Sequence, residues 1–488
     1  MFRTKYLKLL LIVMLVFLPF CDEEAVETIP SNEWLIPKDQ IRDGGPGKDG
    51  IPSIDNPKFI PIKDAPTLNI DLVIGIKIGS FVRAFPHPIL DQHEIVNHTI
   101  NSTSFALTYC PLTGSGIAWD TSAFSLNKTV GVSGQLYNSN LIPYDRGTDS
   151  NWSQMMNMCV NGQLIGQEAK QIHVVETTWG TWKMMYPDSL VLSRDTGFNR
   201  NYDVYPYDDY KFSDRLIFPV SNEDNRLSKK ARIHGVIVGE ETKAYPIGSF
   251  SPVITVLNED FNGLEFVIVG DSLKNFAVSF KRKLSDGTLL EFEPVENELP
   301  VIMKDKGGSK WDIFGNAVSG PRVGAKLEPT NSFISYWFAW AAFYPGAEIY
   351  SGGLGTGLIH TLSADFLEPI RSDSDLLPYH EIKKKELDRF QISEMLTQKW
   401  PEIVTNTEIA PHIVDGQIQG FEIRNRTPLS PLSRLGILDG DIITEVNSIK
   451  LKDVYSLFQA FQIVQKKGKF IIGLERNRRL IRLLYTLE

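Results

Sequence analysis

The sequence predicts an α+β protein, in which an internally duplicated body of strands and short helices is followed by a small β-rich domain. Residues from about 70 to 350 contain the same landmarks twice, and residues 410–488 alternate short apolar runs with Gly and Asp turns. The 488 residues, 42% of them hydrophobic, are enough for several domains with their own cores. A net charge of −9 argues against a nucleic-acid surface, so no nucleic-acid partner is expected.

The amino terminus has the shape of a signal peptide. A basic start precedes an uncharged apolar run from Leu9 to Cys21, which is shorter than the roughly 20 residues of a spanning helix. Because the run ends on a cysteine and then turns acidic, residues 1–21 resemble a bacterial lipoprotein precursor lipidated at Cys21; an ordinary secretory peptide is the alternative. We therefore expect an exported protein of the cell envelope, anchored to a membrane and either periplasmic or on the surface. Residues 22–70 are expected to form an extended Pro/Gly-rich arm.

Internal landmarks indicate the duplication. The pair Gly75 and Ala84 recurs as Gly235 and Ala244 about 160 residues later, and each of the two alanines is followed by an aromatic residue and a proline. Trp152 and Trp182 recur in the same order as Trp311 and Trp340. The body is therefore predicted to consist of a first repeat unit over 71–200 and a second over 201–350. Local patterns predict a hairpin from strands 73–78 and 81–85, and a short helix over 89–98.

The two units differ in their polar residues, and this difference indicates a site. His93, Glu94 and Gln154 correspond to Val253, Ile254 and Ile313. Residues needed only by the fold should appear in both units, so we place a candidate site in the first. Its predicted catalytic residues are His93 and Cys110. Its predicted ligand-binding residues are Glu94, Asn97, Tyr109, Asn138, Asp145, Arg146, Trp152 and Gln154.

Several chemistries remain open for these side chains. His93 and Cys110 could form a thiolate–imidazolium pair, or be a hydrogen-bonded histidine and a buried cysteine. Asp145, Arg146 and Gln154 could clamp a polar small molecule, or form an internal ion pair. The spacing of His93 and His98 does not fit a zinc-protease helix, which needs histidines four apart, and no metal ligand is predicted. The sequence leaves open whether a cofactor is bound and whether Cys110 bonds to Cys159.

Five stretches of the first unit and the arm, in order, carry a family resemblance. They are residues 49–52, 55–59, 91–97, 108–114 and 137–154. Together they resemble the bacterial family known as domain of unknown function 3179, over residues 45–350. The resemblance implies an exported bacterial domain and no particular activity or substrate. Many members have a second cysteine three residues after the first, where this chain has Thr113, so a two-thiol role is not implied.

The carboxy-terminal residues form a separate module. Charged residues 351–395 are expected to be a linker or a solvated helix. Residues 396–488 contain Leu435-Gly436-Ile437 followed by Asp439-Gly440-Asp441, and they resemble a PDZ domain, most like that of the type II secretion protein C family. The resemblance implies that an extended peptide pairs with a strand edge. The positions that would hold it are Gly420, Phe421, Glu422 and Ile423, with Leu457, Phe458 and Phe461 on a helix beside the groove.

The sequence as a whole favours a protein-binding or scaffold protein that acts through its PDZ-like domain. A protein or peptide segment is the expected partner, in addition to the membrane. The alternative is an enzyme or small-ligand receptor that uses the site in the first unit. Whether the protein is an enzyme stays open at this point.

Overall fold

A computed structural model describes much of the chain. The described residues are 33–66, 71–122, 124, 128–208, 210–251, 253–272, 274–350, 381–387, 407–414, 417–425, 432, 435–446, 449–451 and 469–487. The predicted signal peptide with Cys21, and the predicted groove residues Leu457, Phe458 and Phe461, lie outside them.

The described chain combines strands and short helices, as expected of an α+β protein, but it is mostly β-sheet. Its α-helices are only seven residues long each: α2 (His87–His93), α3 (Trp179–Met185) and α4 (Trp337–Phe343). Short 3-10 turns occur at η1 (Lys38–Gln40), η2 (Ile62–Asp64), η3 (Tyr210–Phe212) and η4 (Ile247–Ser249). Among the described residues, no helix combines the length and apolar character that crossing a membrane requires.

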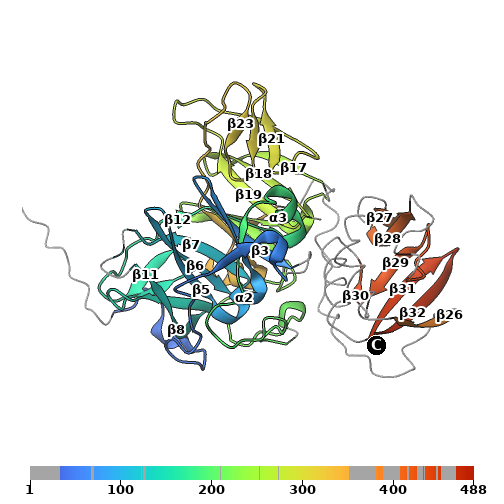
Figure 1. The fold of residues 1–488 in the computed structure, drawn as a ribbon, viewed down its shortest axis with the longest axis horizontal. Helices are drawn as coiled ribbons and strands as arrows, with labels where there is room; N and C mark the ends of the chain where they lie inside the picture. Colours follow the sequence, from blue (N-terminus) through green and yellow to red (C-terminus); the bar gives the residue numbers. More distant parts are fainter. Residues whose placement is uncertain are drawn as a thin grey trace, which may run out of the picture.

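Three sheets are built mainly from residues 71–200 (Figure 1). One has the order β13 (Val174–Thr178), β3 (Leu72–Ile78), β4 (Phe81–Pro86), β14 (Leu190–Leu192), β2 (Phe59–Pro61). The second has the order β12 (Gln171–Ile172), β7 (Ser115–Asp120), β6 (Thr103–Cys110), β5 (Ile95–Ile100). The third has the order β1 (Arg42–Asp43), β8 (Val130–Tyr137), β9 (Asn140–Asp145), β10 (Asn151–Ser153), β11 (Met158–Asn161).

Residues 201–350 also contribute three sheets, which Figure 1 draws in green to orange. The first has the order β24 (Ser332–Tyr336), β15 (Arg232–Val238), β16 (Glu241–Pro246), β25 (Glu348–Ile349). The second has the order β17 (Thr255–Phe261), β18 (Leu264–Asp271), β19 (Phe276–Lys281). The third has the order β20 (Phe292–Pro294), β21 (Val301–Asp305), β22 (Lys310–Asp312), β23 (Ala317–Ser319).

Corresponding landmarks have matching surroundings in the two halves. Gly75 pairs with Ala84 and Gly235 pairs with Ala244, in antiparallel hairpins of the same register. A Cβ atom on Gly75 would come within 1.9 Å of the Trp182 ring, and one on Gly235 within 2.1 Å of the Trp340 ring. Each glycine is therefore required because a tryptophan packs directly against its backbone.

The segment after β4 differs from the predicted helix over 89–98. Helix α2 ends at His93 because Glu94 adopts a φ of 58°, which a right-handed helix does not allow. The β-branched residues that follow form β5, which pairs with β6 from Ile95↔Thr108 to Ile100↔Thr103. His93 and His98 therefore lie on different elements, and the predicted hairpin of β3 and β4 is confirmed.

The described part of the arm, residues 33–66, lies against the first unit. Trp34 forms a bridge with Asn161, and Asp49 donates its backbone N–H to Val132 O at 2.8 Å. Ile54 forms a parallel bridge with Val96 on the edge of β5. The arm thus brings Asp49 and Asp55 next to predicted site residues.

The carboxy-terminal strands form a separate sheet, drawn in orange and red in Figure 1. Its order is β26 (Glu381–Leu387), β32 (Arg479–Leu487), β31 (Lys469–Arg476), β29 (Ile442–Val446), β28 (Gln417–Asn425), β27 (Thr407–Val414), and β30 (Ile449–Lys450) also pairs with β29. β26 lies in the stretch expected to be a linker or solvated helix, but residues 381–387 pair in parallel with β32. A buried cluster that includes Phe421, Leu474 and Tyr485 forms the core of this sheet.

Candidate functional site

Glu94 is the most perturbed acidic group of the predicted site. It sits at the end of α2 with only 6% of its surface exposed. Burial raises the pKa of its carboxyl group to about 8, although a hydrogen bond with Tyr207 acts in the opposite direction. Near neutral pH this side chain is therefore largely a protonated acid, which donates one hydrogen bond as well as accepting others.

Cys110 ends β6 close enough to Glu94 to sense its charge. Burial, and to a smaller extent the negative form of Glu94, raise the pKa of the thiol to about 11. The thiol donates to the Ser139 carbonyl, with an Sγ–O distance of 3.6 Å. Cys110 is therefore a neutral, buried thiol, and Cys159 is also buried and free, so no disulfide joins them.

His93 is completely buried, and both of its ring nitrogens have hydrogen-bond partners other than the thiol. Its Nδ1 lies 2.8 Å from the Pro52 carbonyl, which can only accept, so Nδ1 carries the proton. Its Nε2 lies 2.7 Å from the Tyr202 hydroxyl, which therefore donates to it. Burial lowers the pKa of the ring, which agrees with a neutral imidazole. Because both ring nitrogens have these partners, the structure does not assemble a thiolate–imidazolium pair.

A tyrosine-rich segment, residues 196–208 and 210–222, covers this cluster, and sequence reasoning did not identify it. Tyr207 bonds Glu94, and burial raises the pKa values of Tyr207 and Tyr210. Lys211 forms an ion pair of 2.8 Å with buried Asp91. The available signal was the density of aromatic residues, since the sequence places Tyr202, Tyr205, Tyr207 and Tyr210 within one short run. We call this stretch the covering segment.

Arg146 and Asn97 hold the arm. The Arg146 guanidinium donates to Asp55 at 2.9 Å and to Asp49 at 3.1 Å. Its hydrogen bond with Tyr144 and these two carboxylates raise its pKa against the opposing effect of burial. The Asn97 amide donates to Asp55 at 2.7 Å and to the Val130 carbonyl at 2.8 Å, and accepts from the Val130 N–H at 2.9 Å. Both side chains therefore join the arm to the first unit.

Gln154 belongs to a buried network below Cys110. Its Oε1 accepts from Ser115 and Asn140, both at 2.7 Å. Its Nε2 donates to the Thr108 hydroxyl at 3.0 Å and to the Ser115 carbonyl at 3.2 Å. Gln154 is fully buried, and its hydrogen-bonding capacity is used internally, as the burial of an amide requires.

The remaining predicted ligand-binding residues also have internal partners. Asp145 accepts from the Thr148 N–H at 2.7 Å and from the Trp152 indole at 3.2 Å. Asn138 occupies the β8–β9 turn with a φ of 49° and accepts from the Ser221 N–H at 2.7 Å. Tyr109 is buried, with its ring centroid 4.5 Å from that of His87. The structure thus separates the predicted residues into four groups. Glu94, Cys110 and His93 lie beneath the covering segment, and we call them the covered cluster. The other groups are the residues that hold the arm, Arg146 and Asn97; the buried network of Gln154; and the residues that support turns, Asp145 and Asn138.

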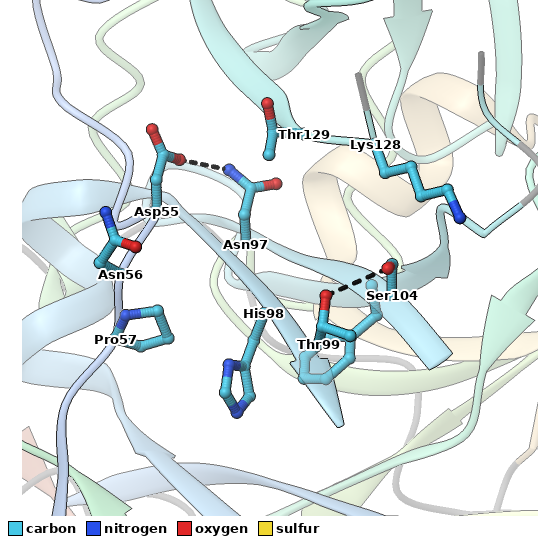
Figure 2. Close-up of a pocket in the computed structure, with 10 residues that line it drawn as sticks. Asp55, Asn56, Pro57, Asn97, His98, Thr99, Ser104, Lys128 and Thr129 are labelled. Atoms are coloured by element: carbon cyan, nitrogen blue, oxygen red, sulfur yellow. Dashed lines mark hydrogen bonds between the residues drawn. The ribbon is translucent and has the colours of Figure 1, made fainter. Parts of the chain in front are cut away.

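A polar cleft of about 420 Å³ opens beside the arm rather than at His93 or Cys110. Figure 2 shows Asp55, Asn56 and Pro57 on one side of it, Lys128 on the other, and Asn97 to Thr99 between them. Of the predicted site residues, Asn97 alone lines it. Within the described residues, no group of three or more His, Cys, Asp or Glu side chains is placed to hold a metal ion.

In the carboxy-terminal sheet, the predicted peptide-binding residues lie in β28. Its Phe421 pairs with Pro411 of β27 on one side and with Ile443 of β29 on the other. The Ile423 N–H donates to the Asp441 carbonyl at 2.8 Å. At Phe421 and Glu422 both edges of β28 therefore already have partner strands, whereas β27 and β26 are the outer strands of the described sheet.

These features define a mostly β, multi-sheet body with a covered acid–thiol cluster, followed by a separate β-sheet module. The chain belongs to the family described as protein of unknown function (DUF3179), whose model matches residues 48–347. A search of curated proteins found no match.

The carboxy-terminal module is similar to PDZ domains of known structure. The PDZ domain of EpsC from Vibrio cholerae matches at 14% identity and a TM-score of 0.16, covering 20% of this chain and 90% of that one. The PDZ domain of the pullulanase C protein of the type II secretion system from Klebsiella pneumoniae, in complex with fatty acid, matches at 21% identity and a TM-score of 0.15, covering 17% of this chain and 88% of that one.

Proposed function

We propose that the protein is an exported lipoprotein of the cell envelope, anchored through Cys21, that binds extended protein segments through its carboxy-terminal sheet. The observation that carries the proposal is the contrast between the two parts of the chain. The predicted polar side chains of the first unit have partners inside the body, whereas β27 ends the described sheet with one backbone edge unpaired. Such an edge pairs readily with another extended chain.

The β27 edge fits this role better than the β26 edge. Ile413 and Val414 of β27 are 57% and 36% exposed, so the edge offers apolar surface beside its backbone groups. β26 contains three consecutive lysines, a composition that discourages strand addition. The expected partner is therefore an extended segment with apolar side chains, bound at β27 rather than at the β28 positions predicted from sequence.

We infer further that the body arose as a duplicated unit and serves as a rigid carrier. The matched Gly–Trp packing of Gly75 and Gly235 supports this inference. The equivalent indole bonds of Trp152 to Asp145, at 3.2 Å, and of Trp311 to Asp305, at 3.0 Å, also support it.

Capture from envelope extracts tests the proposal. The full chain, a chain ending at residue 350 and the Cys110→Ala variant would be compared at equal amounts. Binding through the carboxy-terminal sheet predicts that the shortened chain loses specific partners and that Cys110→Ala keeps them. Retention by the shortened chain would contradict the proposal.

An enzyme or small-ligand receptor is the second candidate function, and the covered cluster favours it. Glu94 combines a positive φ with a carboxyl pKa of about 8, beside Cys110. Backbone strain and a perturbed acid often coincide at functional sites. This candidate predicts a small molecule that copurifies with the native protein and is lost in Glu94→Gln, as detected by mass spectrometry of the denatured extract.

A further inference from the structure

The polar cleft of Figure 2 lies along the outer edge of β5. Its volume of about 420 Å³ lies within the range of roughly 300–1,000 Å³ that is common for ligand sites. Eight of its ten lining residues have polar side chains, although apolar atoms make up more of its exposed surface than polar atoms do. The lining residues are Asp55, Asn56, Pro57, Asn97, His98, Thr99, Ser104, Phe105, Lys128 and Thr129. A ligand with several hydrogen-bonding groups suits such walls.

The backbone of β5 already shows how an extended chain binds at this edge. Ile54 donates to the Ile95 carbonyl and accepts from the Asn97 N–H, both at 2.8 Å. Alternate residues of a strand direct their backbone groups to the same side. The next groups on this side are therefore the Asn97 carbonyl and the Thr99 N–H.

The arm does not use these next two groups. It leaves the edge of β5 after Ile54, and Pro57 has no N–H to donate. The parallel pairing that Ile54 begins with β5 can therefore be continued at the cleft by one residue of another extended chain.

The charges at the two ends of the cleft differ. Asp55 is occupied by Arg146 and Asn97 at the arm end. At the other end Lys128 is exposed and forms no ion pair with a described residue. The pKa of His98 between them is lowered by burial and by Arg83, which keeps its ring neutral. Lys128 is therefore the charged residue of the lining that has no described ion-pair partner, and its ammonium group favours a carboxylate.

We propose that this cleft binds the carboxyl-terminal end of an extended peptide. The peptide main chain continues the ladder of Ile54 along β5, and its terminal carboxylate lies against Lys128. The site is in the body and is independent of the carboxy-terminal sheet, so it goes beyond the function proposed above.

Fluorescence anisotropy with a labelled Thr-Val-Thr-Val peptide and the full chain tests this proposal. The free carboxylate form is expected to bind about fivefold more tightly than the amidated form, and Lys128→Gln removes that difference. Thr99→Pro, which removes the edge N–H, is expected to weaken binding about tenfold, whereas Thr99→Ala changes it little. Lys304→Gln, on β21 and paired with exposed Glu293, is the matched lysine control.

A peptide methylated on its backbone nitrogens provides a test that does not depend on the folding of variants. Methylation on the side that faces β5 should abolish binding, and methylation on the opposite side should not. The proposal is overturned if the peptide fails to bind, if both methylated peptides bind equally, or if binding is indifferent to Lys128→Gln and Thr99→Pro. Binding that persists in both variants would place the peptide elsewhere on the chain.

Discussion

At the residue scale, Glu94 joins a strained backbone to a buried acid. A non-glycine residue at φ 58° is disfavoured by about 1–3 kcal/mol, and the surrounding fold must supply that energy. The hydrogen bond with Tyr207 and the covering segment packed above it keep the Glu94 carboxyl group buried in the protein.

Replacing Glu94 by Gln should remove a pH dependence of stability. The carboxyl pKa rises from 4.5 in the unfolded chain to about 8 in the folded protein, so between these values the folded state holds a proton that the unfolded state releases. The free energy of unfolding should therefore fall by on the order of 4 kcal/mol as pH rises from 4.5 through 8. Urea unfolding should show Glu94→Gln close to the wild type near pH 4.5 and more stable at pH 9.

Exposed Glu168 provides the control for that experiment. Glu168→Gln should retain the wild-type decline with pH. A Glu94→Gln variant that declines as steeply as the wild type would show that Glu94 is ionised in the folded protein at neutral pH.

The two thiols of the body should be unreactive in the folded state. Burial raises the pKa of Cys110 to about 11 and that of Cys159 to about 12, and only the thiolate reacts rapidly. Ellman's reagent at pH 8 should label neither residue until urea is added, with Cys110→Ser and Cys159→Ser used to assign each signal. Rapid labelling of native Cys110 would instead favour the enzyme candidate.

At the element scale, glycine–tryptophan packing fixes the central hairpin of each half of the body. Gly75→Ala and Gly235→Ala should each destabilise the protein by about 1–3 kcal/mol or more, because the new methyl group would overlap an indole ring. Denaturant midpoints measure this cost. The control is Gly79→Asn in the β3–β4 turn, where space is open and the φ of 60° suits asparagine. Alanine variants as stable as the wild type would show that the packing is looser than the structure indicates.

Some elements followed from sequence patterns and others did not. The β3–β4 hairpin was predictable because two short, mostly apolar runs flank a Gly-containing turn. The end of α2 was not, because it depends on Glu94 adopting a positive φ that its residue type does not favour. β26 was not predictable either, since its charged sequence pairs with a strand about 100 residues away through tertiary contacts.

The candidate site, like the fold, could be predicted from the sequence only in part. Sequence comparison of the two halves selected Glu94 and Cys110, which lie together in the structure. It grouped them with Arg146 and Asp145, which support the arm and a turn. The type of a polar residue does not tell whether its side chain is reactive or only forms hydrogen bonds with buried backbone groups. Its hydrogen-bond partners in the three-dimensional structure make that distinction.

At the scale of the whole molecule, the two halves of the body are joined by polar contacts as well as by a shared core. Arg232 of β15 donates to Glu176 of β13 at 2.6 Å, with both side chains buried, and this pairing lowers the pKa of Glu176 to about 2 despite burial. The Tyr336 N–H donates to the Thr113 carbonyl at 2.7 Å. One hydrophobic cluster includes both Trp152 and Trp340. The body should therefore behave as one rigid unit, which suits a carrier.

Site-specific photocrosslinking in cells shows whether partners bind at the carboxy-terminal edge strand or at the covered cluster. A photoreactive phenylalanine analogue would replace Ile413 on β27 or, as the control, Val323 in the body, which is 66% exposed. We expect discrete adducts with other polypeptides from position 413 that are absent from position 323 and unchanged by Cys110→Ala. No adducts at position 413, or the same pattern from both positions, would contradict binding at the edge strand.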